Sequence, residues 1–122
     1  MGKIQLREVD EKDCDILFNW ANDKDVRQNS FSCEKIMYEN HLLWFETKIH
    51  NDNCLKFILM DETVNIGTVY LDVVDGVGKI SYSISRDFRG KGYGTIVIEK
   101  LEEKIKEWEL DIHELYAEVK YT

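Results

Sequence analysis

Apolar and polar residues alternate along several stretches of the chain, and a period of two is typical of half-buried β-strands. The first such stretch runs from Ile4 to Val9. Later stretches alternate or are rich in apolar residues and lie between turn-forming residues. They predict further strands at Cys54–Met60, Val64–Val73, about Gly78–Ile84 and Leu115–Lys120.

A helical period of about 3.6 residues governs three other stretches. From Glu11 to about Asn22 the apolar residues recur on one face, and Asp10 can cap this first helix. Ser32 can cap a second helix that ends at about Ile49. A third, strongly amphipathic helix is expected over about Gly94–Glu109. The predicted order is strand, two helices, three strands, helix, strand.

Short turn signals connect the three central strands. Asp61-Glu62 is expected to link the first two, and Asp75-Gly76 is a strong signal for a two-residue hairpin between the second and third. Gly67 lies inside a predicted strand, which indicates a bulge or a closely approaching neighbour. These signals predict an antiparallel meander in the middle of the chain.

The composition is that of one globular domain. The chain has 122 residues, 43% hydrophobic and 11% aromatic, which is enough for a single core and excludes a disordered chain. No run approaches 18 apolar residues, and the N-terminus has no apolar centre like that of a signal peptide. We therefore expect a soluble cytoplasmic protein that does not bind membranes.

The net charge argues against a nucleic-acid-binding protein, and the cysteines argue against a metal-binding protein. A net charge of -8 argues against nucleic acid as a partner, because phosphate binding needs a basic face. Cys14, Cys33 and Cys54 are widely spaced and odd in number, as expected of reduced thiols, and they form no metal-ligand pattern with the histidines. We predict no metal site.

A basic, glycine-rich segment lies between the third central strand and the long helix. Glycine tolerates positive φ and lets the backbone approach a ligand, and the first turn of a helix presents unpaired N–H groups with a positive dipole end. A phosphate or diphosphate is the natural ligand of such a turn. We call residues 89–95 the glycine turn; its sequence is Arg89-Gly90-Lys91-Gly92-Tyr93-Gly94-Thr95.

Spacing separates the known phosphate loops. No Gly-x-x-x-x-Gly-Lys run followed by Ser or Thr is present, which argues against a Walker loop. The spacing Arg-x-x-Gly-x-Gly, placed after several strands, also differs from the dinucleotide fingerprint. A tight chain reversal without a ligand is the alternative interpretation of the glycines.

The spacing of Arg89, Gly92 and Gly94 resembles the Arg/Gln-x-x-Gly-x-Gly/Ala loop of the GNAT superfamily of N-acetyltransferases. The resemblance implies an α/β (α+β) GNAT fold: a mixed, mostly antiparallel sheet with helices on both faces, whose coenzyme strand and last strand lie parallel and splay apart. It implies acetyl-CoA as cofactor, with its pyrophosphate on residues 89–95. Backbone N–H groups near Tyr82, Ser83 and Ile84 would hold the pantetheine arm and polarise the thioester.

The N-terminal half resembles acetyltransferases that act on nucleotide-linked 4-amino sugars, nearest to those of pseudaminic acid biosynthesis. The segments concerned are Trp20–Asp23, Val26-Arg27, Asn29–Phe31 and His41–Phe45. This resemblance implies that the acceptor is bound by Arg27, Asn29, His41 and Trp44. Three of them have a plainer interpretation: Trp44 as a core anchor, His41 as a hydrogen-bonded helix histidine, and Arg27 as a solvated loop charge.

Ribosomal-protein N-terminal acetyltransferases share part of the pattern, so an alanine N-terminus is an alternative acceptor. In those enzymes the final strand carries a catalytic glutamate where Glu118 stands here, and a general base must deprotonate the amine before it attacks. An exposed strand residue is the equally simple interpretation of Glu118. Tyr121 comes too early to match the family's acid.

The resemblance implies a further helix and strands after the last strand, whereas this chain ends at Tyr121-Thr122. We therefore expect residues 1–122 to form a single, C-terminally truncated GNAT-like domain. A non-catalytic coenzyme-binding module is the second hypothesis, in which a homodimer covers the incomplete sheet.

Overall fold

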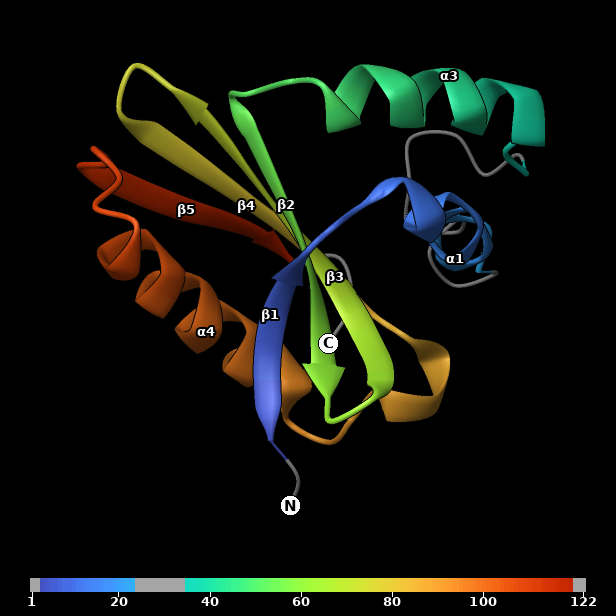
Figure 1. Cartoon of the computed structure of the whole chain (residues 1–122). Coiled ribbons are helices and arrows are strands. Elements are labelled where there is room, and N and C mark those ends of the chain that lie inside the picture. The colour runs from blue at the N-terminus through green and yellow to red at the C-terminus, as the bar shows by residue number, and fades with distance from the viewer. Residues whose placement is uncertain (1–2, 24–34, 120–122) are drawn as a thin grey trace.

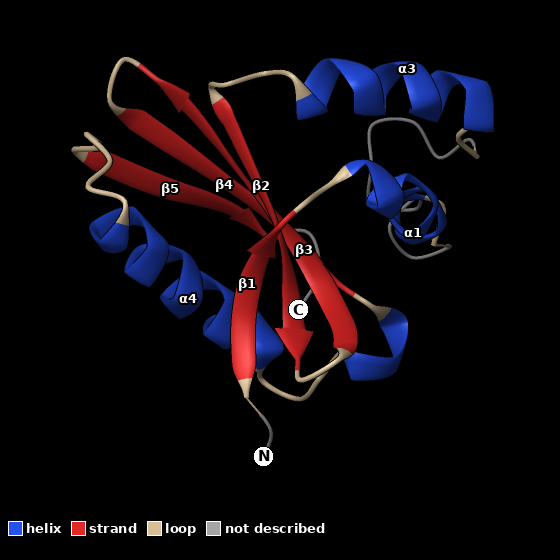
Figure 2. Cartoon of the chain, in the orientation of Figure 1, coloured by secondary structure: helices blue, strands red, loops and turns tan. Residues whose placement is uncertain are grey.

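The computed structural model describes residues 3–23 and 35–119, which form one five-stranded sheet with helices on both faces (Figures 1 and 2). The strands lie in the order β1-β2-β3-β4-β5, which is also their order in the chain. The strands are β1 (Ile4–Glu8), β2 (Cys54–Asp61), β3 (Val64–Val74), β4 (Val77–Ile84) and β5 (Glu114–Val119). The helices are η1 (Glu11–Asp13), α1 (Cys14–Ala21), α3 (Tyr38–Ile49), η2 (Arg86–Phe88) and α4 (Tyr93–Glu107).

The predicted meander is confirmed. Strands β1 to β4 pair antiparallel, and β3 and β4 are joined by Asp75-Gly76, whose φ angles of 51° and 78° are those of a two-residue hairpin turn. Helix α4 then crosses the sheet, and β5 pairs parallel to β4 from Val77↔Glu114 to Tyr82↔Val119. The predicted parallel pair is therefore present. Within the described residues, β5 accompanies β4 as far as Tyr82.

The two faces of the sheet carry separate cores, because successive strand residues point to opposite faces. Helix α4 lies on one face (Figure 1), where Val97 and Leu101 pack among buried strand residues such as Phe57. Helices α1 and α3 lie on the other face, where Leu17 and Phe45 join a smaller cluster.

Two predicted boundaries need correction, and one predicted helix cap is confirmed. Helix α3 begins at Tyr38, and residues 35–37 are not helical, so the predicted start is too early; the predicted cap Ser32 lies outside the described residues. Asp61 still belongs to β2, and the turn is formed by Glu62-Thr63, with Glu62 at φ 56°. The first helix begins as the short η1, where Asp10 accepts a hydrogen bond from the Lys12 N–H and forms the expected cap.

Both features expected at Gly67, a closely approaching neighbour and a bulge, are present in the structure. A Cβ on Gly67 would collide with the carbonyl oxygen of Ser83 in the neighbouring strand, so only glycine fits there. The register of β2 against β3 also shifts between Leu59 and Met60, next to the Leu59↔Gly67 pair. The close approach of β3 and β4 at this point lies directly before the glycine turn.

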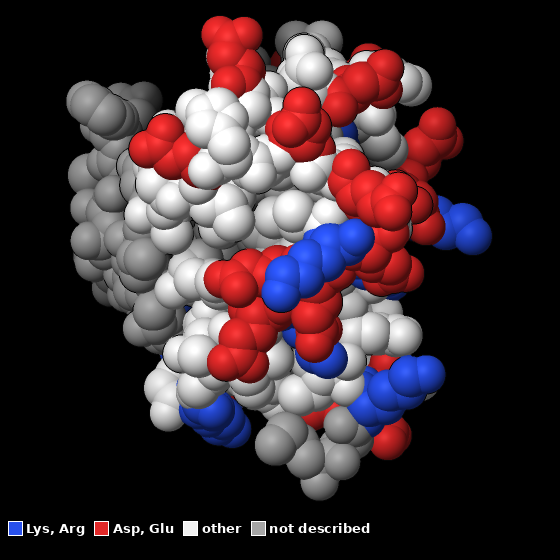
Figure 3. Space-filling model, turned by 90° about the vertical axis from the view of Figure 1, so that its left-hand side faces the viewer, with Lys and Arg blue, Asp and Glu red and all other residues white. Residues whose placement is uncertain are grey.

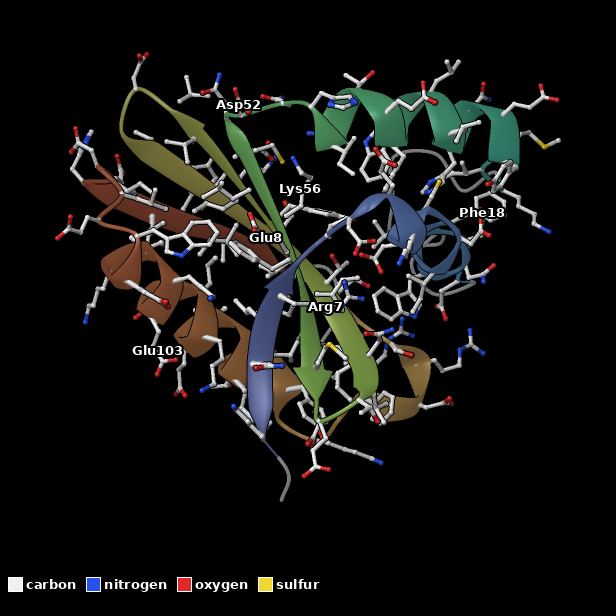
Figure 4. The ribbon with its side chains drawn as sticks, viewed as in Figure 1. Arg7, Glu8, Phe18, Asp52, Lys56 and Glu103 are labelled. Atoms are coloured by element: carbon white, nitrogen blue, oxygen red, sulfur yellow. The ribbon has the colours of Figure 1, made fainter. Side chains whose placement is uncertain are left out.

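Leu101 is a fully buried residue of α4, and its replacement by alanine is expected to destabilise the fold strongly. A Leu→Ala change at such a site loses transfer energy and leaves a cavity, which costs about 2–5 kcal/mol. Glu103 points away from the sheet (Figure 4), so Glu103→Ala serves as the control, with an effect within about 0.5 kcal/mol. Urea melts of both variants measure the difference; equal effects would contradict this packing.

An ion pair fixes the connection from β1 to α1. Arg7, which projects from β1 (Figure 4), donates from both terminal nitrogens to the two carboxylate oxygens of Asp13, each at 2.8 Å. Asp13 also accepts from the Asp10 N–H at 2.8 Å. Burial alone would raise the pKa of Asp13, but these hydrogen bonds and the charge of Arg7 together lower it below its ordinary value.

The lowered pKa of Asp13 predicts acid-sensitive stability. Its contribution is fully present above the ordinary aspartate pKa and is lost as the pH falls through the lowered, folded-state value. Asp13→Asn should therefore cost about 2–3 kcal/mol at pH 7. The loss should shrink in denaturant melts carried out at progressively lower pH. A loss that stays constant down to pH 2 would contradict this role.

Among the helices of residues 3–23 and 35–119, none is both long and apolar enough to cross a membrane.

Candidate functional site

The glycine turn connects β4 to α4 through two residues with positive φ. Gly90 has φ 75° and Gly92 has φ 87°, and Gly92 is also the N-cap of α4. A side chain at either position would be strained, since L-residues rarely adopt this backbone conformation. A Cβ built on either glycine would have no atom within 4 Å, so the backbone of the turn faces open space.

The start of α4 is left without a side-chain cap. Gly92 has no side chain to accept a hydrogen bond, and the first turn contains no acidic residue. The N–H groups of Tyr93, Gly94 and Thr95 precede the first helical hydrogen bond, which runs from the Ile96 N–H to the Gly92 carbonyl at 3.3 Å. This end of a 15-residue helix therefore offers unpaired donors and a positive dipole end to an anion.

A pocket of about 330 Å³ lies at this helix start. We call it the phosphate pocket. Four of its six lining residues belong to the glycine turn, and the other two come from β4 and α4. The lining residues are Tyr82, Gly90, Gly92, Gly94, Thr95 and Ile98.

The guanidinium of Arg89, one of the residues expected to hold the pyrophosphate, forms its contacts within the fold. Its Nε donates to the Ile84 carbonyl at 2.9 Å, and Nη1 lies 3.3 Å from the carboxylate of Asp23. The side chain is only 13% exposed and does not line the phosphate pocket. Arg89 therefore supports the turn from the side away from the pocket, because its guanidinium contacts both the end of β4 and Asp23, two residues after α1.

Lys91 and Tyr93 also lie outside the pocket lining. Lys91 is exposed, with its Nζ 5.9 Å from the ring centre of Phe88. Tyr93 donates its hydroxyl to Asp61 at 3.1 Å and packs edge-on against Phe88. Tyr93 thus anchors the first turn of α4 to the end of β2, whereas Lys91 supplies a solvent-facing positive charge.

A larger pocket, of about 480 Å³, lies on the opposite side of β4, between the sheet and helices α1 and α3. We call it the acceptor pocket. Tyr82 lines both pockets, so the two meet at β4. The acceptor pocket is lined by Leu17, Trp20, Ala21, Ile36, Asn40, His41, Trp44, Lys48, Thr68, Tyr70, Asp72, Ser81, Tyr82 and Ser83.

His41 lines this pocket but is hydrogen-bonded within the fold. It is 3% exposed, and its Nε2 lies 2.9 Å from the Cys14 carbonyl, to which it donates. Burial lowers the pKa of His41 and outweighs the hydrogen bond to the Cys14 carbonyl, which acts in the opposite direction, so the neutral ring is favoured. The histidine links α3 to α1, as the plainer interpretation of the sequence expected.

Trp44 and Tyr70 form an aromatic corner of the acceptor pocket. Their ring centres are 6.0 Å apart in an edge-on arrangement, and Trp44 remains 37% exposed. Trp44 therefore presents part of its ring to the pocket rather than anchoring the core. Burial raises the pKa of Tyr70 to about 12, so its hydroxyl stays protonated and can donate a hydrogen bond.

Asp72 and Lys48 carry the charges of the acceptor pocket within the described residues. Their side chains are both about one-third exposed, and the Lys48 Nζ lies 3.5 Å from the Asp72 carboxylate. The pair leaves the described lining close to neutral. Over the face shown in Figure 3, by contrast, acidic side chains cover more surface than basic ones, in keeping with the net charge of -8.

The register of the parallel pair places Glu118 beside Ser81, which lines the acceptor pocket. Ser83 and Ile84 continue past the last described β5 partner and pair with Thr68 and Gly67 of β3. The end of β4 therefore borders both pockets. The predicted acceptor residues Arg27 and Asn29 lie outside the described residues.

Sequence reasoning missed most of the lining of the acceptor pocket, including its polar residues Lys48, Tyr70 and Asp72. The signal for the last two was present, because a two-residue turn at Asp75-Gly76 fixes the pairs Tyr70↔Ser81 and Asp72↔Lys79. The described residues contain no group of three or more His, Cys, Asp or Glu side chains that could hold a metal ion.

Three solved structures illustrate the fold. Spermidine N-acetyltransferase from Vibrio cholerae, in complex with CoA and spermine, is 18% identical with a TM-score of 0.78 over 93% of this chain and 69% of that one. An aminoglycoside acetyltransferase in complex with coenzyme A is 18% identical with a TM-score of 0.80, covering 94% and 73%. A ribosomal-protein α-N-acetyltransferase in complex with coenzyme A is 13% identical with a TM-score of 0.78, covering 96% and 71%.

No curated protein matches the sequence. The family model described as "Acetyltransferase (GNAT) domain" matches residues 3–121, nearly the whole chain. This match confirms the predicted fold and the predicted enzyme class, a transferase. It does not distinguish the amino-sugar subfamily from others. The chain therefore belongs to the GNAT acetyltransferase domain family.

Proposed function

We propose that this chain transfers an acetyl group from acetyl-CoA to a primary amine, and that the amine is the 4-amino group of a nucleotide-linked sugar. The observation that carries the first part is the uncapped start of α4, where two glycines with positive φ open the phosphate pocket. Family membership and the coenzyme A in the related structures support the same donor.

The residues of the glycine turn fit the diphosphate of coenzyme A. The open space over Gly90 and Gly92 lets phosphate oxygens approach the backbone, and the unpaired N–H groups of Tyr93, Gly94 and Thr95 can donate to them. No acidic residue stands in the first turn to repel the ligand. The pantetheine arm would run toward Tyr82, which borders both pockets.

Different groups of the chain would assist different steps of the acetyl transfer. Bound acetyl-CoA would supply a thioester: an N–C bond would form as the C–S bond breaks, and the leaving thiolate would take up the second proton that the nitrogen releases. Backbone N–H groups near Tyr82, Ser83 and Ile84 would stabilise negative charge on the carbonyl oxygen. Glu118 would take the proton of the acceptor ammonium, since a protonated amine cannot attack. Its register position beside Ser81 supports this role.

The lining of the acceptor pocket favours a sugar over a polyamine. Trp20, Trp44 and Tyr70 offer apolar faces, while Asn40, Ser81 and Ser83 offer hydrogen-bonding groups around them. A polyamine carries several positive charges, yet Asp72 is the one carboxylate that lines the pocket within the described residues, and Lys48 already pairs with it. Lys48 could instead meet a phosphate of the nucleotide.

Thiol release from acetyl-CoA tests the acceptor directly. A UDP-linked 4-amino sugar, spermidine and an alanine-terminated peptide are offered in parallel. We expect kcat/KM for the sugar to exceed that for spermidine and the peptide by about 10²-fold or more, since a site built for specific hydrogen bonds rejects analogues that lack them. A clear preference for the peptide or for spermidine would overturn the acceptor while leaving the donor intact.

A non-catalytic, dimerising module is the second candidate. The observation that favours it is β5, an edge of the described sheet with Leu115 39% and Tyr116 51% exposed. Size-exclusion chromatography with light scattering, combined with the thiol assay, separates the two functions. A dimer that binds acetyl-CoA but releases no thiol with any of the three acceptors would support the module, and an active monomer would exclude it.

A further inference from the structure

Asp23 joins two parts of the molecule that are distant in sequence. It is the second residue after α1, and its side chain is 14% exposed. Its carboxylate oxygens contact two arginines: Arg86, the first residue of the short η2, through Nε at 3.1 Å, and Arg89, the residue after η2, through Nη1 at 3.3 Å. The second arginine immediately precedes Gly90, the first glycine of the turn.

The contact with Arg89 is the more consequential of the two. Arg89 and Asp23 are both about one-seventh exposed, so the pair is largely shielded from water and from salt screening. Arg86 is 56% exposed, and an exposed ion pair contributes little. Since Arg89 also donates to the Ile84 carbonyl, the carboxylate of Asp23 holds the side chain that braces the end of β4.

We propose that Asp23 is a positioning residue for coenzyme binding: it fixes Arg89 so that the N–H groups of the glycine turn converge on the diphosphate. This inference rests on the proposed function. The turn itself contains three glycines, which lose more conformational freedom on ordering than other residues do. A brace on the residue before them reduces the ordering that ligand binding must impose.

The same end of α1 also shapes the acceptor pocket. The neighbouring residue Asn22 forms two hydrogen bonds with the backbone of Ile36. Its Oδ1 accepts from the Ile36 N–H at 2.6 Å, and its Nδ2 donates to the Ile36 carbonyl at 2.9 Å. Trp20 and Ile36 line the acceptor pocket. Asp23 thus ties the wall of the acceptor pocket to the backbone that faces the phosphate pocket.

The test compares coenzyme A with pantetheine, which lacks both the diphosphate and the 3′-phosphoadenosine attached to it. The Kd of coenzyme A is measured by calorimetry, and that of pantetheine by NMR shift titration. For Asp23→Asn we expect the Kd of coenzyme A to rise about tenfold, the middle of the range for residues that act through another group, with the Kd of pantetheine unchanged. Arg86→Gln is the matched control, with a change of less than about twofold in either Kd.

The possible results distinguish failure of the role of Asp23 from failure of the proposed function. A wild-type chain that binds no coenzyme A would overturn the proposed function, and this inference with it. A wild type that binds, with Asp23→Asn binding equally well or losing both ligands alike, would overturn the inference alone. If Asp23→Asn does not fold, the double variant Asp23→Asn/Arg89→Gln removes both charges; wild-type affinity of that variant for coenzyme A would likewise overturn it.

Discussion

Replacing Gly92 by valine is expected to abolish the heat protection that acetyl-CoA gives the wild-type chain. At a ligand concentration of 100 Kd, binding should stabilise the wild type by about 2.7 kcal/mol, which is roughly 10 °C in Tm for a domain of this size. Gly92 has φ 87°, and its Cβ position points into open space beside the uncapped start of α4. A branched side chain would fill the space that the diphosphate needs and distort the turn.

Gly92→Asn separates these two effects. Asparagine tolerates a left-handed backbone, so this variant should fold nearly as well as the wild type while still blocking the phosphate pocket. We therefore expect the Tm of ligand-free Gly92→Asn to lie within roughly a few degrees of the wild-type value. Acetyl-CoA should no longer raise the Tm of this variant. Thermal melts with and without ligand measure both quantities. A Gly92→Asn protein that is still protected in full would contradict the binding site.

Glu118→Gln is expected to lower kcat by about 10²–10⁴-fold, the contribution of a positioned general base. Glutamine keeps the size of the side chain but cannot accept the ammonium proton. Binding of acetyl-CoA should be unchanged, since the phosphate pocket lies on residues 82–98. The thiol-release assay gives kcat, and thermal melts give the ligand shift.

Glu114→Gln provides the control for this substitution, because Glu114 lies in the same strand at the opposite end, paired with Val77. Its kcat should stay within about twofold of the wild type, as for surface substitutions away from functional features. A Glu118→Gln enzyme with wild-type kcat would exclude the glutamate as base and direct attention to another proton acceptor.

The elements of the fold could be predicted because local signals agree with one another. The Asp75-Gly76 dipeptide predicts a two-residue hairpin, and the structure has that turn with both residues at positive φ. Alternation then determines which strand residues face α4 and which face α1 and α3. The glycine turn could be found for the same reason, since strand, glycines and amphipathic helix follow one another directly.

Features that depend on long-range contacts could not be predicted in this way. The side chain of Arg89 turns toward Asp23, 66 residues earlier in the chain, and no local pattern encodes that contact. The start of α3 at Tyr38 is likewise set by tertiary contacts, because Tyr38 donates to Asp15 and His41 to the Cys14 carbonyl. Propensity is a weak prior where packing of this kind decides a boundary.

Binding of the diphosphate at the glycine turn can be measured through the backbone amide chemical shifts of the labelled wild-type chain during titration with acetyl-CoA. We expect saturable changes that are largest at Gly90, Gly92, Gly94 and Thr95, whose N–H groups and backbone face the phosphate pocket. Saturable binding with its largest changes elsewhere in the chain, or no change at all in a folded sample, would contradict diphosphate binding at this turn.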